Sequence, residues 1–172
     1  MIMRQGQQLL LPANPVFIWG SMLLALLFNM LPLGRTPWMP DFLALVLVFW
    51  SVHQPLRVGI GVAFFFGLCM DVHQAALLGQ HALAYTALSF FAITIHRRLL
   101  WFSVPSQAVQ VLPLFATAHA IEMAIRLLAG GAFPGFMILF APALESVLWP
   151  VVSVVLLAPQ RRAPDPDENR PL

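Results

Sequence analysis

Six long apolar runs, joined by short polar links, decide what this chain of 172 residues can fold into. The first run, Pro15 to Leu33, is 19 residues without a charge, enough helix to cross a hydrocarbon layer of about 30 Å. A chain of this size that is 60% hydrophobic and only 9% charged cannot hide its apolar surface in one soluble core. We therefore expect lipid to be its main solvent.

The apolar runs predict an all-α, polytopic membrane protein with a single integral membrane domain spanning 1–172. Helices are expected at about 15–33, 39–53, 57–71, 77–95, 107–128 and 133–158, with short cytoplasmic ends at 1–14 and 159–172. The second and third runs are short and meet at a tight turn containing Pro55, so we expect them to form a helical hairpin. This pair either spans fully or enters as a re-entrant hairpin, and both alternatives leave the later helices in the same orientation.

The arginines predict how these helices are oriented. If the N-terminus is cytoplasmic, only Arg35 and Arg126 fall near the outer side. The other seven fall inside: Arg4, Arg57, Arg97, Arg98, Arg161, Arg162 and Arg170. Because positive residues gather on the cytoplasmic side of membrane proteins, we expect six transmembrane helices with both termini inside.

Composition also limits the partners. The arginines are spread in ones and twos, so there is no basic patch for nucleic acid. The single cysteine, Cys69, excludes an internal disulfide. Trp19, Trp50 and Trp101 near the inner face, and Trp38 near the outer face, are expected to anchor the protein at the interfaces with membrane lipids.

Small residues recur at every fourth position of the third run. Gly59, Ala63 and Gly67 form this ridge, and the next step of four reaches Asp71. Small residues at this spacing let a second helix approach closely in a membrane. A carboxylate on such a face should point into protein or a watery cavity, so Asp71 is the first candidate for a functional role.

The fifth run carries three polar residues on one helix face, namely His119, Glu122 and Arg126. One interpretation is an intramembrane pair of Glu122 with Arg126, while His119 bonds a neighbour. A second is a proton or ion pathway that also uses Asp71 and Glu145. A third is contact with a partner protein through the same face.

Catalytic and metal-binding motifs are absent from the sequence. Ligand-type side chains occur at Asp71, His73, His81, His119 and Glu122, but without a recognised metal-site spacing. There is no Gly-x-Ser-x-Gly elbow, no HExxH and no phosphate-binding loop. We therefore expect neither catalysis, nor a metal, nor a cofactor.

Four motifs in order resemble the rod shape-determining MreD family of bacterial membrane proteins. They are Pro37-x3-Asp41-Phe42-Leu43, Trp50-x4-Pro55-x-Arg57-x-Gly59, Gly67-x3-Asp71-x7-Gly79 and Leu148-Trp149-Pro150. The likeness extends over about residues 15–160 and is strongest between Pro37 and Gly79. It marks nine residues as important without assigning their roles: Trp50, Pro55, Arg57, Gly59, Gly67, Asp71, Gly79, Trp149 and Pro150. From their chemistry, Gly59, Ala63 and Gly67 are expected to pack helices, and the others to have a structural or partner-binding role.

This resemblance implies a non-catalytic, multi-pass protein of the bacterial inner membrane that takes part in cell shape and lateral peptidoglycan synthesis. The implied partners are MreC and an elongation complex with MreB, RodZ, a RodA-type glycosyltransferase and a class B penicillin-binding protein. The family is also similar in fold to the substrate-binding membrane subunits of energy-coupling-factor vitamin transporters. A transporter subunit is therefore the alternative function, and it would need a ligand cavity and an energising partner.

Overall fold

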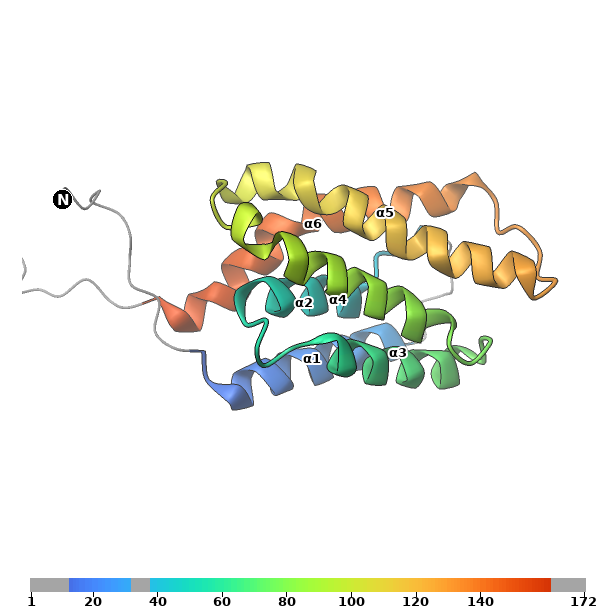
Figure 1. The fold of residues 1–172 in the computed structure, drawn as a ribbon, viewed down its shortest axis with the longest axis horizontal. Helices are drawn as coiled ribbons and strands as arrows, with labels where there is room; N and C mark the ends of the chain where they lie inside the picture. The colour runs from blue at the N-terminus through green and yellow to red at the C-terminus, as the bar shows by residue number, and fades with distance from the viewer. Residues whose placement is uncertain (1–12, 32–37, 162–172) are drawn as a thin grey trace, which may run out of the picture.

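The computed structural model describes residues 13–31 and 38–161, which form an all-helical bundle without strands in these ranges (Figure 1). The helices are α1 (Pro15–Met30), α2 (Phe42–His53), α3 (Ile60–Gln74), α4 (Gln80–Leu99), α5 (Val104–Leu128), η1 (Phe136–Leu139), α6 (Phe140–Leu157) and η2 (Ala158–Gln160). The expected all-α class and the expected number of long helices are thereby confirmed. Arg4, Arg35, Pro37, Arg162 and Arg170 lie outside the described residues.

Capping residues set several helix boundaries that differ from the expected ones. The helix expected at 39 begins at Phe42, because the Asp41 side chain accepts a hydrogen bond from the Ala44 amide at 2.9 Å. The last apolar segment is divided into η1 and α6, and Gly135, just before η1, has a positive φ of 92°. Local backbone chemistry therefore shortens two of the predicted helices.

Two stretches are long and apolar enough to cross a membrane: Val104–Leu128 and Phe136–Gln160, each of 25 residues. α1, α2 and α3 are shorter, with 16, 12 and 15 residues. Length and composition thus support membrane insertion through α5 and α6, whereas six spans remain a prediction.

α2 lies at the centre of the bundle. Every residue from Leu43 to Val52 is buried, and α2 packs against α1, α4 and α6. A helix that is apolar on all sides must be covered on all sides. Because neighbouring helices surround it, α2 does not need to match the thickness of a lipid layer, although it is only about 18 Å long.

Trp50, on α2, is not the interfacial anchor expected from the sequence. It is fully buried, and its indole Nε1 donates to the Ser21 hydroxyl of α1 at 2.9 Å. Its ring packs between Phe17 and Phe49, with ring centroids 6.0 and 5.0 Å away. This correction arises because α2 packs against α1, α4 and α6, so that its residues are buried as far as Val52.

The other tryptophans expected at the interfaces do reach the surface. Trp19 and Trp38 are about half exposed, and Trp101 is 90% exposed. Their interfacial role remains a prediction.

α3 packs against α4 and makes little contact with α2, so the expected α2–α3 hairpin is wrong. The reason lies at Gly67, where an added Cβ would stand 2.4 Å from the Ala82 Cα of α4. Ala63 is fully buried on the same helix, whereas Gly59 is the N-cap of α3, where an added Cβ would make only an ordinary contact, 3.9 Å from the Pro55 carbonyl oxygen. α4 therefore packs against the small-residue face of α3, and the two helices come closest at Gly67.

Replacing Gly67 with alanine should destabilise the protein by about 1–3 kcal/mol, because the new methyl group would overlap backbone of α4. Gly61→Ala is the matched control, since it lies on the same helix and has no atom within 4 Å of its added Cβ. Thermal unfolding of both purified variants in one detergent measures the difference. Equal stability of the two variants would contradict close packing at Gly67.

Candidate functional site

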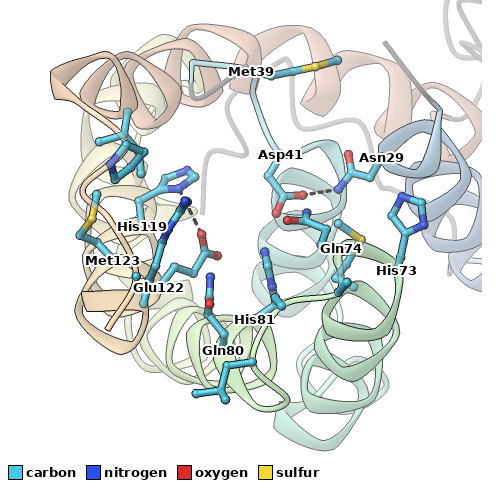
Figure 2. A pocket seen from close by; sticks show the side chains of 18 of the residues that line it. Asn29, Met39, Asp41, His73, Gln74, Gln80, His81, His119, Glu122 and Met123 are labelled. Carbon is cyan, nitrogen blue, oxygen red and sulfur yellow. Dashed lines mark hydrogen bonds and ion pairs between the residues drawn. The ribbon is translucent and has the colours of Figure 1, made fainter. Parts of the chain in front are cut away.

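A cavity of about 940 Å³ opens at one end of the bundle, where segments far apart in the sequence meet (Figure 2). Its lining includes the ends of α1, α3 and α5, the start of α4, and the residues before α2. Side chains of both charges and several amides and imidazoles line it. They include Asn29, Asp41, His73, Gln80, Glu122 and Arg126. The cavity brings polar side chains from several helices together and is the candidate site.

Asp71 lies beside this cavity and fastens α3 to the N-terminus of α4. Its Oδ2 accepts from the Gly79 amide at 2.8 Å and the Ala82 amide at 3.3 Å. Its Oδ1 accepts from the His81 amide at 2.7 Å and lies 2.8 Å from the His81 Nδ1. A carboxylate is well suited to the unpaired amides at the start of a helix. The protein interior therefore uses the whole acceptor capacity of this buried acid, which is 1% exposed.

Gly79 shapes the same junction. It is the N-cap of α4 and has a φ of +104°, a conformation that residues with a Cβ rarely adopt. This backbone turn presents the first amides of α4 to Asp71. The Asp71-x7-Gly79 spacing in the sequence therefore corresponds to a single junction between the end of α3 and the start of α4.

Asp41 forms a second junction, which ties the start of α2 to three other helices. Its Oδ1 accepts from Asn29 Nδ2 at 2.6 Å, and the Tyr85 hydroxyl donates to Oδ2. The Asp41 amide donates to Glu145 Oε1 at 2.9 Å. Asn29 in turn accepts from the Phe42 amide at 3.1 Å. The side chain and the backbone amide of Asp41 thereby connect α1, α2, α4 and α6.

Glu145 is fully buried and joins this junction to α5. His119 Nε2 lies 2.9 Å from Glu145 Oε1, and His119 Nδ1 lies 3.5 Å from Glu122 Oε2. With both ring nitrogens facing carboxylates, His119 is placed to donate to each of them. Glu145 Oε2 has no hydrogen-bond partner among the described residues.

The expected ion pair of Glu122 with Arg126 does not form in the described structure. The partner of Glu122 is His119, and no ion pair joins Glu122 to Arg126 although both line the cavity. Glu145 likewise contacts His119 rather than Arg126. The physical reason is that His119 lies between two carboxylates from different helices, which attract it from both sides.

Other residues marked by the sequence lie away from this site. Arg57 donates from Nη1 to the Ala13 carbonyl at 2.8 Å and so ties the α2–α3 link to the segment before α1. Trp149 is fully buried, and its Nε1 donates to Gln107 Oε1 of α5 at 3.1 Å. Pro150 follows within α6, and Pro55 lies in the turn after α2. Arg57 and Trp149 therefore connect different pairs of segments, and neither lines the cavity.

Sequence reasoning gave no role to Asn29, Tyr85 or Asp41 in holding the site together. The signal available for Asp41 was its place directly before an apolar run, which is typical of an N-cap. Asn29 and Tyr85 lie inside apolar runs, and nothing local in the sequence indicates that they meet. No group of three metal-ligating side chains occurs among the described residues, and the carboxylates mostly accept hydrogen bonds from the protein itself.

Comparison with known proteins identifies the family. The model of the rod shape-determining protein MreD family matches residues 12–160, which is most of the chain. This chain belongs to the MreD family. A rod shape-determining protein MreD from Haemophilus influenzae is 24% identical over 135 residues, covering 76% of this chain and 81% of that protein. No solved structure matches the chain significantly.

Membership of the MreD family implies a rod shape-determining role for this membrane-associated protein. The matched range includes all six α-helices, both carboxylate junctions and the cavity. The candidate site therefore lies within the part of the chain that carries the MreD likeness.

Asp71→Ala should lower the free energy of unfolding by about 2 kcal/mol or more, because it leaves buried amides at the start of α4 without an acceptor. Asp71→Asn should lie between the wild type and Asp71→Ala, since its amide keeps one accepting oxygen. Denaturation of the purified proteins in detergent measures this order. A fully stable Asp71→Ala protein would rule out the proposed α3–α4 junction.

His119→Ala should destabilise the protein by about 3 kcal/mol, because it removes a donor from the buried Glu145. The double variant Glu122→Arg, Arg126→Glu exchanges the two charges. Its melting temperature should be no higher than that of Glu122→Arg alone. Melting temperatures of the four proteins, including the wild type, test this. Recovery in the exchanged variant would instead support a direct pair of Glu122 with Arg126.

Proposed function

We propose that this chain is a non-catalytic membrane scaffold of the bacterial elongation machinery, which helps to couple the cytoplasmic filament to peptidoglycan synthesis along the side wall. The observation that carries this proposal is the match of the MreD family over residues 12–160. The Asp71 and Asp41 carboxylates accept hydrogen bonds from other helices of the same chain and so hold these helices together, which supports a scaffold. Rigid connections of this kind suit a protein that positions partners.

The proposed topology has six transmembrane helices with both termini in the cytoplasm of a bacterial inner membrane. The outer surface of the bundle supports it, because large apolar side chains are exposed on five of the six α-helices. Examples are Val16, Phe65, Phe90, Val109 and Val147. Such a surface suits lipid rather than water.

The arrangement of helix ends fits the same topology. The links α3–α4 and α5–α6 lie together at one end of the bundle (Figure 1). Arg126 lines the cavity at that end, whereas Arg97 and Arg98 lie in the last turn of α4, which runs away from it. The cavity is then on the outer side of the membrane.

The proposed partners are MreC and, through the elongation complex, MreB, RodZ, a RodA-type glycosyltransferase and a class B penicillin-binding protein. Trp50, Asp71 and Trp149 are buried, so they would influence partner binding only through the fold. Arg57 is exposed, and it is one of the marked residues that remains accessible to a partner. Direct contacts are therefore expected on the exposed helix faces.

A second candidate function is a substrate-binding subunit of a vitamin transporter. The cavity of about 940 Å³ favours this alternative, because it is large enough for a small organic ligand. Tight co-purification of a vitamin would support it. Co-purification of MreC and wall synthases would support the scaffold.

The scaffold predicts that the tagged wild-type chain and Gly61→Ala capture MreC from solubilised membranes and restore rod shape to cells depleted of their own copy. Gly67→Leu should lose both, because the leucine would separate α3 from α4. Immunoblots of membrane level and pull-down yield, together with cell images, test this. No capture of MreC by the wild type would overturn the proposed role, and full rod shape with Gly67→Leu at normal level would contradict the need for close α3–α4 packing.

A further inference from the structure

The cavity at the outer end presents two opposite charges from one helix face. Glu122 and Arg126 both line it and lie four residues apart on α5, which places their Cβ atoms about 6 Å apart. Residues of opposite charge at this spacing usually stabilise a helix by pairing with one another. Here no ion pair joins them within the described structure. Among the described residues, Arg126 therefore has no ion pair, and the charged partner of Glu122 is His119.

The opposite wall has little free ionic capacity. Asp41 already accepts from Asn29, from the Ala44 amide and from the Tyr85 hydroxyl. Figure 2 shows Asp41 and Asn29 across the cavity from His119 and Glu122, with Gln80 and His81 between them. Gln80 adds an amide that can donate and accept, and the His81 Nδ1 already faces the Asp71 carboxylate at 2.8 Å. The ionic recognition of a ligand therefore falls to the α5 wall.

Glu122 has acceptor capacity left over for such a ligand. Its contact with His119 involves Oε2 at 3.5 Å, and a carboxylate has two oxygens with about four acceptor positions. An ammonium group, with three N–H donors, suits this carboxylate. The Arg126 guanidinium suits a phosphate or carboxylate, which it can bind through two parallel hydrogen bonds.

We propose that this cavity binds a molecule in which an ammonium group and an anionic group lie a few bonds apart, with the ammonium at Glu122 and the anion at Arg126. Phosphoethanolamine has this chemistry, both as a free solute and as the headgroup of phosphatidylethanolamine. The volume of about 940 Å³ accommodates a headgroup of this size. Ile138 of η1 also lines the cavity, and the adjacent Phe136, Met137 and Leu139 are exposed, so an apolar surface adjoins it where acyl chains would lie.

The test uses the full-length purified chain, stripped of lipid in detergent, with three lipids of identical acyl chains and with free phosphoethanolamine. Phosphatidylethanolamine should bind at least ten times more tightly than phosphatidylcholine, whose quaternary ammonium has no N–H donor for Glu122. It should also bind more tightly than phosphatidylglycerol, which lacks the ammonium. Native mass spectrometry and ligand-dependent thermal shifts measure both differences. Equal binding of the three lipids, or no binding of any probe, overturns the proposal.

Variants separate the site from general lipid adhesion. Glu122→Gln and Arg126→Gln should each weaken phosphatidylethanolamine binding about tenfold, while Glu122→Asp and Arg126→Lys should recover part of it by restoring the charge. The matched control is Arg97→Gln, which removes a surface arginine from the last turn of α4 outside the cavity. Equal effects of Arg126→Gln and Arg97→Gln would show general adhesion and overturn the site.

Free phosphoethanolamine identifies the source of the ligand. Binding of the free solute with the same dependence on Glu122 and Arg126 supports the site and indicates a soluble ligand. Binding of phosphatidylethanolamine alone, with that dependence, supports the site and indicates a lipid. Both measurements use the isolated chain, so they do not depend on whether it assembles with MreC.

Discussion

The close contact of α3 with α4 is the constraint on which the rest of the structure depends. Because Gly67 has no Cβ, the Ala82 backbone of α4 can occupy the space that a Cβ would need. This close approach brings the first amides of α4 within hydrogen-bond distance of Asp71. α4 then packs against α2 on one side and α5 on another. The steric and the hydrogen-bonding parts of this contact reinforce each other, because the carboxylate reaches three amides only when the helices are close.

Polar groups connect the helices at the end of the bundle where the cavity opens. Helices surrounded by lipid gain little hydrophobic energy from meeting, so hydrogen bonds between them contribute to their specific association. Asp41 connects four helices, and His119 links α5 to Glu145 of α6. These cross-connections hold the walls of the cavity and leave Glu122 and Arg126 on its surface.

The sequence was sufficient for the helical class, because apolar runs separated by proline, glycine and charge have few other solutions. It was also sufficient to single out Gly67 and Asp71, since steric size and charge are local properties. It was insufficient to show which helix or side chain each of these elements contacts. The third helix was expected to form a hairpin with the second, and Glu122 was expected to pair with Arg126, but α4 and His119 are the observed neighbours.

The reason for these errors is that sequence spacing reports neighbours along one helix and does not say which other helices pack against it. Trp50 illustrates it, because a tryptophan near the end of an apolar run is typical of an interface, yet α1 and α6 enclose this one. Asp41 is the converse case: its local role as an N-cap was readable, and its contacts with Asn29, Tyr85 and Glu145 were not.

The central place of α2 has a consequence for the order of assembly during synthesis. α2 leaves the ribosome second, whereas two of the helices that cover it, α4 and α6, are made fourth and last. Until α4 and α6 have been made, this 12-residue segment has α1 beside it but lacks the rest of its native cover, and it is too short to cross a hydrocarbon layer by itself. Truncation before α6 would therefore leave part of the most apolar helix of the fold uncovered.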